Sequence, residues 1–136
     1  MEKINVEIHW EEKNFSCGWA NEEIGAVIST NKTLDGLKRE LPNLLKNHIR
    51  SMVEAGESVP EWLKNGEYEV EYTLSASAII RDAERYTTMA AISRATGINH
   101  NLLSQYANNL KVPRPKQRER IVSGLHKIGE MALAIR

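Results

Sequence analysis

The chain has 136 residues, of which 41% are apolar and 26% are charged, and its formal net charge at pH 7 is zero. This composition is typical of a globular protein, and nothing in it suggests a disordered chain. The single cysteine excludes an internal disulfide, and the four histidines lack the spacing of zinc ligands. We therefore expect neither a metal site nor a cofactor.

No run of about 18 apolar residues suits a membrane span. The first ten residues, MEKINVEIHW, lack the apolar core of a secretory signal. The sequence thus predicts a cytoplasmic protein that does not enter membranes.

Charge is divided unevenly along the chain. Residues 1–75 contain eight Lys and Arg against fourteen Asp and Glu, whereas residues 76–136 contain ten against four. Such asymmetry is typical of a chain of which one part meets a polyanion. The basic second half is the part expected to do so.

The acidic half begins with the period-two alternation of β-strands. Three such runs follow one another and predict an antiparallel meander, and a fourth strand comes later, after a helical segment. The expected strands span residues 4–10, 15–19, 26–30 and 68–74. With the helix between the last two, the order is βββαβ.

The helical segment starts near Thr33, which suits an N-cap, and continues to residue 53 with one apolar stripe. Pro42 lies inside it, and we expect a kink or an early break there because proline removes a backbone hydrogen bond. Residues 56–66 are expected to form a connection from which Trp62 and Leu63 pack onto the core. The first domain is thus expected to span residues 1–74.

The second domain, residues 75–136, is expected to be all-α. It starts with a helix over residues 75–86, and Pro113 and Pro115 then separate the middle of the domain from a last helix over residues 116–135. Apolar residues recur along this last helix at spacings of four and three, a seam that suits packing or pairing: Ile121, Leu125, Ile128, Ala132 and Ile135.

Residues 88–108, TMAAISRATGINHNLLSQYAN, are the most informative segment of the chain. They predict a helix, a sharp corner at Gly97 and a second helix capped by Asn99, which is the pattern of a DNA-binding helix-turn-helix. Leu102, Leu103 and Tyr106 of the second helix are expected to face inward. The polar residues of this helix are expected to contact base edges in a major groove, which are read by short hydrogen-bonding side chains: Asn99, His100, Asn101, Ser104, Gln105 and Asn108.

Phosphate contacts are expected from residues that flank this segment, most of them basic. Lysine and arginine supply most of the sequence-independent affinity for DNA. The expected contacts are Thr88, Arg94, Lys111, Arg114, Lys116 and Arg118.

Other candidate sites are weaker. Glu67, Glu69 and Glu71 share one face of the fourth strand and suit either a metal-dependent nuclease or, as we expect, a solvated strand face. Cys17 falls in the apolar phase of its strand and is expected to be core packing, and His48 is expected to be a partly buried structural residue. We expect no catalytic residues and no enzymatic activity.

The segment TMAAISRATGINHNLLSQYAN, followed by KVPRPKQRERIVSGLHKIGEMALAI, resembles the Cro/repressor-like (XRE-type) helix-turn-helix domain at the C-terminus of HicB antitoxins. The first half resembles the HicB domain, a partial ribonuclease-H-like βββαβ fold, through Gly25, the strand over residues 26–30 and the helix start at Thr33. The chain departs from the family in lacking a Pro-Gly-Cys-like segment before the third strand and in having Pro42 within the helix.

The resemblance implies an α+β protein whose first domain neutralises a small RNA-cleaving HicA-type toxin while the second represses its own operon. It also implies a homodimer or higher homo-oligomer on operator DNA, since helix-turn-helix proteins of this kind bind two half-sites about one DNA turn apart. The alternative is a ligand-responsive helix-turn-helix repressor without a toxin partner.

Overall fold

The computed structural model describes all 136 residues and shows an α+β chain that divides into two compact units. The first unit contains residues 1–8 and 13–73, and the second contains residues 9–12 and 74–136. The elements of the first unit are β1 (Glu2–Glu11, whose end belongs to the second unit), β2 (Asn14–Asn21), β3 (Gly25–Asn31), α1 (Leu34–Glu54), α2 (Glu61–Lys64) and β4 (Tyr68–Leu74).

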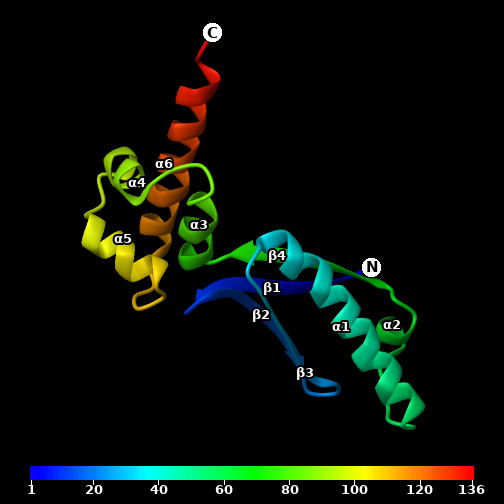
Figure 1. Cartoon of the computed structure of the whole chain (residues 1–136). Helices are drawn as coiled ribbons and strands as arrows, with labels where there is room; N and C mark the ends of the chain where they lie inside the picture. Colours follow the sequence, from blue (N-terminus) through cyan, green and yellow to red (C-terminus); the bar gives the residue numbers. More distant parts are fainter. The chain divides into compact units, whose positions relative to one another are not determined.

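The four strands form one sheet in the order β3-β2-β1-β4 (Figure 1). β1 and β2 are joined by a tight turn at Glu12, whose φ is 54°, and β2 pairs antiparallel with β3 from Phe15 opposite Asn31 to Asn21 opposite Gly25. β4 lies beside β1 and runs in the same direction (Figure 1). The predicted meander is confirmed for the first three strands, and β4 forms the edge of the sheet next to β1.

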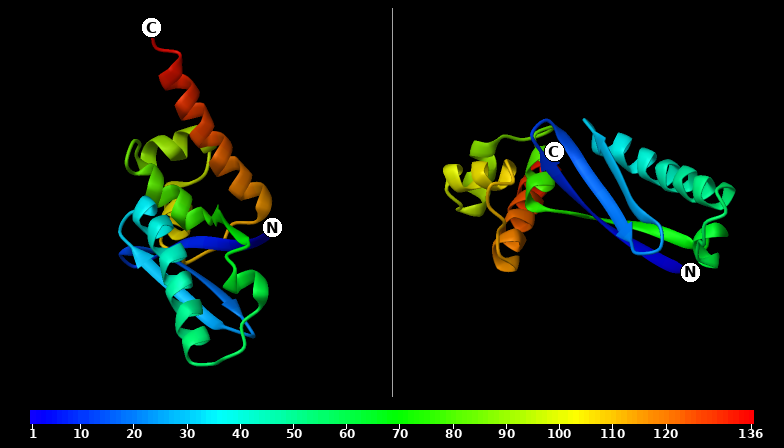
Figure 2. Two further views of the ribbon diagram at one scale, coloured as in Figure 1. Left: turned by 90° about the vertical axis from the view of Figure 1, so that its right-hand side faces the viewer. Right: turned by 90° about the horizontal axis from the view of Figure 1, so that it is seen from below.

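Helix α1 lies along one face of this sheet, as the views of Figures 1 and 2 agree. The alternation of the strands sends Ile4, Val6 and Ile8 of β1 to this face, where each is at most 1% exposed. The same face receives the apolar stripe of α1, which is buried at Leu37, Leu41, Leu45 and Ile49. Cys17 is 4% exposed among these side chains, so the expectation that it is core packing is confirmed.

The early break expected at Pro42 is wrong, because α1 continues through it to Glu54. Proline removes the amide that would bond to the carbonyl four residues earlier, which belongs to Lys38. The hydroxyl of Tyr72 on β4 donates to that Lys38 oxygen at 3.3 Å. The carbonyl left without its helical partner therefore has another one, which offsets part of the cost of an interior proline.

The connection between α1 and β4 is more ordered than expected, since it contains the short helix α2. The packing predicted for it is confirmed: Leu63 is 2% exposed, and the Trp62 ring makes edge contacts with Trp19 and Tyr68 at 6.3 Å. His48 is partly buried and its Nε2 lies 2.6 Å from the carbonyl oxygen of Ile24, so it ties the loop before β3 to α1.

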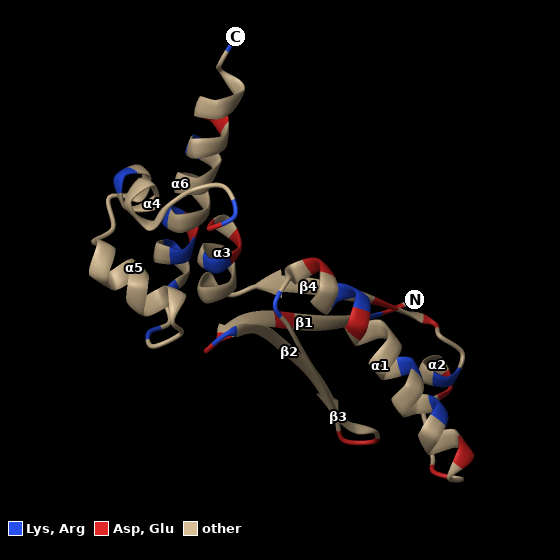
Figure 3. Cartoon of the chain, in the orientation of Figure 1, with Lys and Arg blue, Asp and Glu red and all other residues tan.

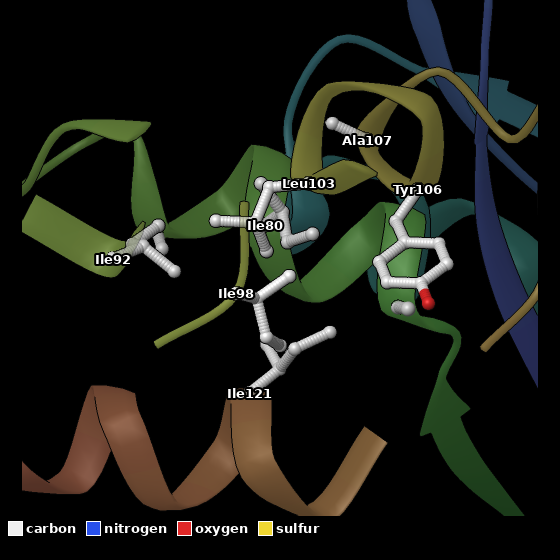
Figure 4. Close-up of a cluster of buried hydrophobic side chains, with 9 residues drawn as sticks. Ile80, Ile92, Ile98, Leu103, Tyr106, Ala107 and Ile121 are labelled. Atoms are coloured by element: carbon white, nitrogen blue, oxygen red, sulfur yellow. The ribbon is translucent and has the colours of Figure 1, made fainter. Parts of the chain in front are cut away.

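The second unit contains four helices: α3 (Ala76–Ala83), α4 (Met89–Thr96), α5 (His100–Ala107) and α6 (Pro115–Leu133). Ser75 caps α3, which ends three residues before the expected end at residue 86. Pro115 occupies the first turn of α6, where its missing amide costs nothing. Figure 4 shows the core that these helices share, with side chains from each of them meeting around Ile80, Leu103 and Ile121.

Part of the apolar seam predicted on the last helix packs in this core. Ile121 is fully buried, and Leu125 and Ile128 pack against the same cluster. Farther along α6 the side chains leave the core: Met131 is 62% exposed and Ile135, beyond the helix, is 80% exposed.

Residues 9–12, at the end of β1, belong to the second unit, which the sequence does not indicate. The Trp10 amide donates to the hydroxyl of Ser77 at 2.9 Å, and the Arg81 guanidinium lies 5.4 Å from the centre of the Trp10 ring. Such contacts depend on residues about 70 positions apart, so no local pattern reveals them.

Candidate nucleic-acid interface

Helices α4 and α5 are joined by a turn that a dense set of hydrogen bonds holds in place. Gly97 has a φ of 73°, the left-handed conformation that residues with a Cβ rarely adopt, and its amide donates to the Ser93 carbonyl at 2.8 Å. The Ser93 hydroxyl donates to the Ile98 carbonyl at 2.6 Å, and the Thr96 hydroxyl accepts from the Ile98 amide at 3.1 Å. Ile98 itself is 3% exposed. The direction of α5 relative to α4 is therefore fixed by both backbone and side chains.

Both helices begin with a side-chain cap. The Thr88 hydroxyl accepts from the Ala91 amide at 3.1 Å, and the side-chain oxygen Oδ1 of Asn99 accepts from the Asn101 amide at 2.7 Å. Caps of this kind contribute about 1 kcal/mol each. Both side chains were expected to contact DNA, and both are exposed, but each also has a structural role.

The inner side of α5 anchors it firmly. Leu103 and Ala107 are fully buried and Tyr106 is 7% exposed (Figure 4). Behind α4, helix α6 approaches so closely at Gly124 that an added Cβ would lie 2.4 Å from Cγ2 of Thr96. The predicted inward and outward sides of α5 are thus those of the structure, except that Leu102 is only partly buried.

The outward side of α5 displays the polar residues that the sequence singled out. His100 and Asn101 are exposed at its start, and Ser104 and Gln105 are half-buried one turn later. The side chains of His100, Asn101 and Gln105 form no hydrogen bond or ion pair within the chain. These three are therefore free to bind another molecule.

Asn108 was also expected to contact bases, and in the structure its exposed side chain has partners within the chain. Its side-chain nitrogen Nδ2 donates to the Ser104 carbonyl at 2.9 Å, and its side-chain oxygen Oδ1 accepts from the Arg81 guanidinium. Arg81 also donates to the Ala107 carbonyl at 3.2 Å. Asn108 and Arg81 together close the C-terminal end of α5, a role that sequence reasoning missed for Arg81 because the two residues lie 27 positions apart.

Four of the basic side chains expected at phosphates are exposed and form no ion pair or hydrogen bond within the chain: Arg94, Lys111, Arg114 and Lys116. Lys111 and Arg114 lie in the segment between α5 and α6, and Lys116 follows in the first turn of α6. In Figure 3 the lysines and arginines of this unit lie on α3, α4, α6 and the segment between α5 and α6. Unpaired cations beside a polar helix are what a phosphate backbone requires.

Arg118 was also expected at a phosphate, and in the structure it has a partner within the chain. It is only partly exposed, and its guanidinium donates to the Leu74 carbonyl at 2.7 Å. Arg120, which is close to it in sequence, donates to the Thr96 carbonyl at 2.9 Å and so supports the turn before α5. Of the basic residues near α5, some therefore hold the unit together while others remain free.

The three glutamates around β4 do not converge. Glu71 pairs with Lys3 at 3.0 Å, which raises the pKa of Lys3 chiefly through this hydrogen bond and charge, and Glu67 and Glu69 are exposed. Nowhere in the chain do three or more His, Cys, Asp or Glu side chains form a group that could hold a metal ion. The glutamates are the solvated face of a half-buried strand.

No protein-family model, no curated protein and no solved structure matches this chain. In addition, none of its helices combines the length and the apolar character needed to cross a bilayer.

Proposed function

We propose that this protein is a DNA-binding repressor in which α4 and α5 form a helix-turn-helix and α5 enters the major groove. The observation that carries the proposal is the free polar surface of α5, at His100, Asn101 and Gln105, on a helix whose opposite side packs in the core. Asparagine and glutamine can each form two hydrogen bonds with adenine, which discriminates against other bases by about 1–3 kcal/mol.

The free cations support this proposal in a second way. Arg94 at the end of α4, together with Lys111, Arg114 and Lys116 beyond α5, can contact phosphates while α5 lies in the groove. Because none of them is neutralised within the chain, binding releases counterions from the DNA and depends steeply on salt. Two copies on two half-sites one turn apart would give a symmetric operator.

The proposed role of the first unit is to bind and silence a small basic toxin of the HicA type, which makes the whole protein an antitoxin that represses its own operon. Two observations support a basic protein partner. The face of the sheet opposite α1 carries Glu69, Glu71 and the 68% exposed Ile28. The unit as a whole also has an excess of acidic residues, which gives electrostatic complementarity to a basic partner.

A gel-shift titration of the protein against the DNA upstream of its own gene tests the repressor proposal. We expect a specific complex that survives excess unrelated DNA, and failure to bind at low salt would contradict the proposal. Co-expression with the product of the adjacent reading frame tests the antitoxin role. We expect that co-expression abolishes both the RNA cleavage and the growth arrest that the adjacent product causes alone. An adjacent product without ribonuclease activity would contradict this role.

A second candidate is a ligand-responsive repressor, and one groove in the first unit favours it. Ile49 and Val53 of α1 line this groove with Leu63 and Tyr68, and Lys46 and Arg50 lie beside them. An apolar groove with adjacent cations suits a small amphipathic anion. A purified protein whose DNA affinity changes on addition of such anions, with no toxin encoded beside it, would favour this candidate over the antitoxin.

A further inference from the structure

We propose that a second copy of this chain docks in the groove between α4 and the C-terminal half of α6, with the two α6 helices antiparallel around a two-fold axis. The inference depends on the proposed function only for the expectation that two copies act together on DNA. The shape of the groove and the charges beside it point to the docking surface independently of DNA binding.

The groove has a floor of small and apolar side chains. Ala91 and Ala95 of α4 line one side, and Ile128, Met131 and Ala134 line the other. Alanines let a helix approach closely, and Met131, 62% exposed, is an adaptable apolar side chain with nothing covering it. A helix seated here would place its own methionine over the two alanines of α4.

The charges beside the groove identify the occupant. Lys127 and Glu130 lie one turn apart on α6, both exposed, and neither forms an ion pair within the chain. Arg94 of α4, which is also exposed and unpaired, is the third charged residue that lines the groove. In an antiparallel pair of α6 helices whose two-fold axis passes between residues 128 and 129, Lys127 of each copy faces Glu130 of the other. One symmetric arrangement thus satisfies four charges at once, as an isologous interface requires.

The groove with its flanking charges is therefore a self-complementary surface. A two-fold axis repeats each contact, so the pair of Lys127 with Glu130 and the cover of Met131 over Ala91 and Ala95 both occur twice. An interface built from α6 and a few residues of α4 in each copy is small, and we expect a dissociation constant on the order of micromolar.

Sedimentation velocity of the full chain without DNA tests the inference with charge exchange. Lys127→Glu and Glu130→Lys each place like charges opposite one another, and each is expected to weaken the dimer about tenfold or more. A mixture of the two variants restores opposite charges at both pairs, so heterodimers are expected to form with the affinity of the unchanged protein. Lys32→Glu, on an exposed side chain before α1, makes the same change of charge elsewhere and is expected to leave dimerisation unaltered.

Met131→Asp gives a second measurement on an exposed side chain and is expected to abolish the dimer while leaving the circular dichroism spectrum unchanged. An unchanged chain that stays monomeric at several hundred micromolar would overturn the inference. So would single variants that dimerise normally, or a mixture that does not rescue. None of these outcomes bears on binding of DNA by single copies, which the gel shift measures separately.

Discussion

Single residues determine whether α5 can be displayed, and Gly97 is the clearest case. Its left-handed φ and its amide bond to Ser93 are what the chain needs to reverse between α4 and α5. The sequence alone indicated this role, because glycine between two amphipathic helices is the usual solution to such a turn. The bonds of the Ser93 and Thr96 hydroxyls within the turn were not predictable, since serine and threonine offer several local alternatives.

Gly97→Ala is expected to destabilise the protein by about 1–2 kcal/mol, because a Cβ disfavours the left-handed conformation. Gly97→Asn is expected to cost less, since asparagine adopts that conformation more readily. Urea denaturation of the three proteins measures the difference. Equal stability of the alanine and glycine forms would show that the turn does not require positive φ.

Cys17 gives a prediction about pH. Burial raises the pKa of its thiol from 9.0 to about 11, so the folded protein retains a proton that the unfolded chain loses first. Stability from this group is therefore fully present below pH 9 and is lost as the pH rises from 9 to 11. The midpoint of urea denaturation should decrease from pH 8 to pH 10.5 in both proteins, and the decrease should be smaller for Cys17→Ala than for the unchanged protein. An identical fall in both would contradict the assignment.

At the level of elements, the alternation of the strands and the stripe of α1 were sufficient to predict the first unit. The exceptions were the short helix α2, where an irregular connection was expected, and Pro42, where local reasoning expects a kink or a break and the helix continues. The reason lies on another element, because the Tyr72 hydroxyl reaches the Lys38 carbonyl from β4. Compensation across 34 positions of sequence is invisible to any window-based pattern.

Tyr72→Phe is expected to cost about 1 kcal/mol, the usual contribution of such a hydrogen bond. In a Pro42→Ala background the helix regains its own amide for the Lys38 carbonyl, so the same Tyr72 substitution should cost less. A double-mutant cycle in urea measures this coupling. Additive effects would mean that the tyrosine does not compensate for the proline.

Helix α5 is expected to supply the base-specific contacts to DNA, and the segment after it is expected to supply phosphate contacts. Gln105→Ala should weaken binding at particular base pairs by about 1–3 kcal/mol each, whereas Arg114→Ala should weaken all sequences and reduce the salt slope by about 1. Arg50→Ala on α1 is the control for loss of a positive charge. Fluorescence anisotropy with operator variants at several salt concentrations separates the two effects. Equal losses at every position for both variants would contradict the division.

For the molecule as a whole, charge and periodicity were enough to separate an acidic α/β part from a basic helical part. The outward placement of the candidate side chains was predictable where it depends on the periodicity of one helix, as for His100, Asn101 and Gln105. The partners of a side chain were not predictable where long-range bonds occupy it, as for Asn108 with Arg81 and Arg118 with the Leu74 carbonyl. Burial and hydrogen bonding thus reduce a set of polar candidates to the ones that remain free.

Backbone amide chemical shifts, recorded by NMR during titration of the full chain with its upstream DNA, test the role of α5 most directly. The largest changes are expected in residues 99–105 and in the segment from Lys111 to Lys116, with small changes along α1. Binding that leaves α5 unperturbed, or that shifts only residues of the first unit, would contradict the proposal that this helix reads DNA.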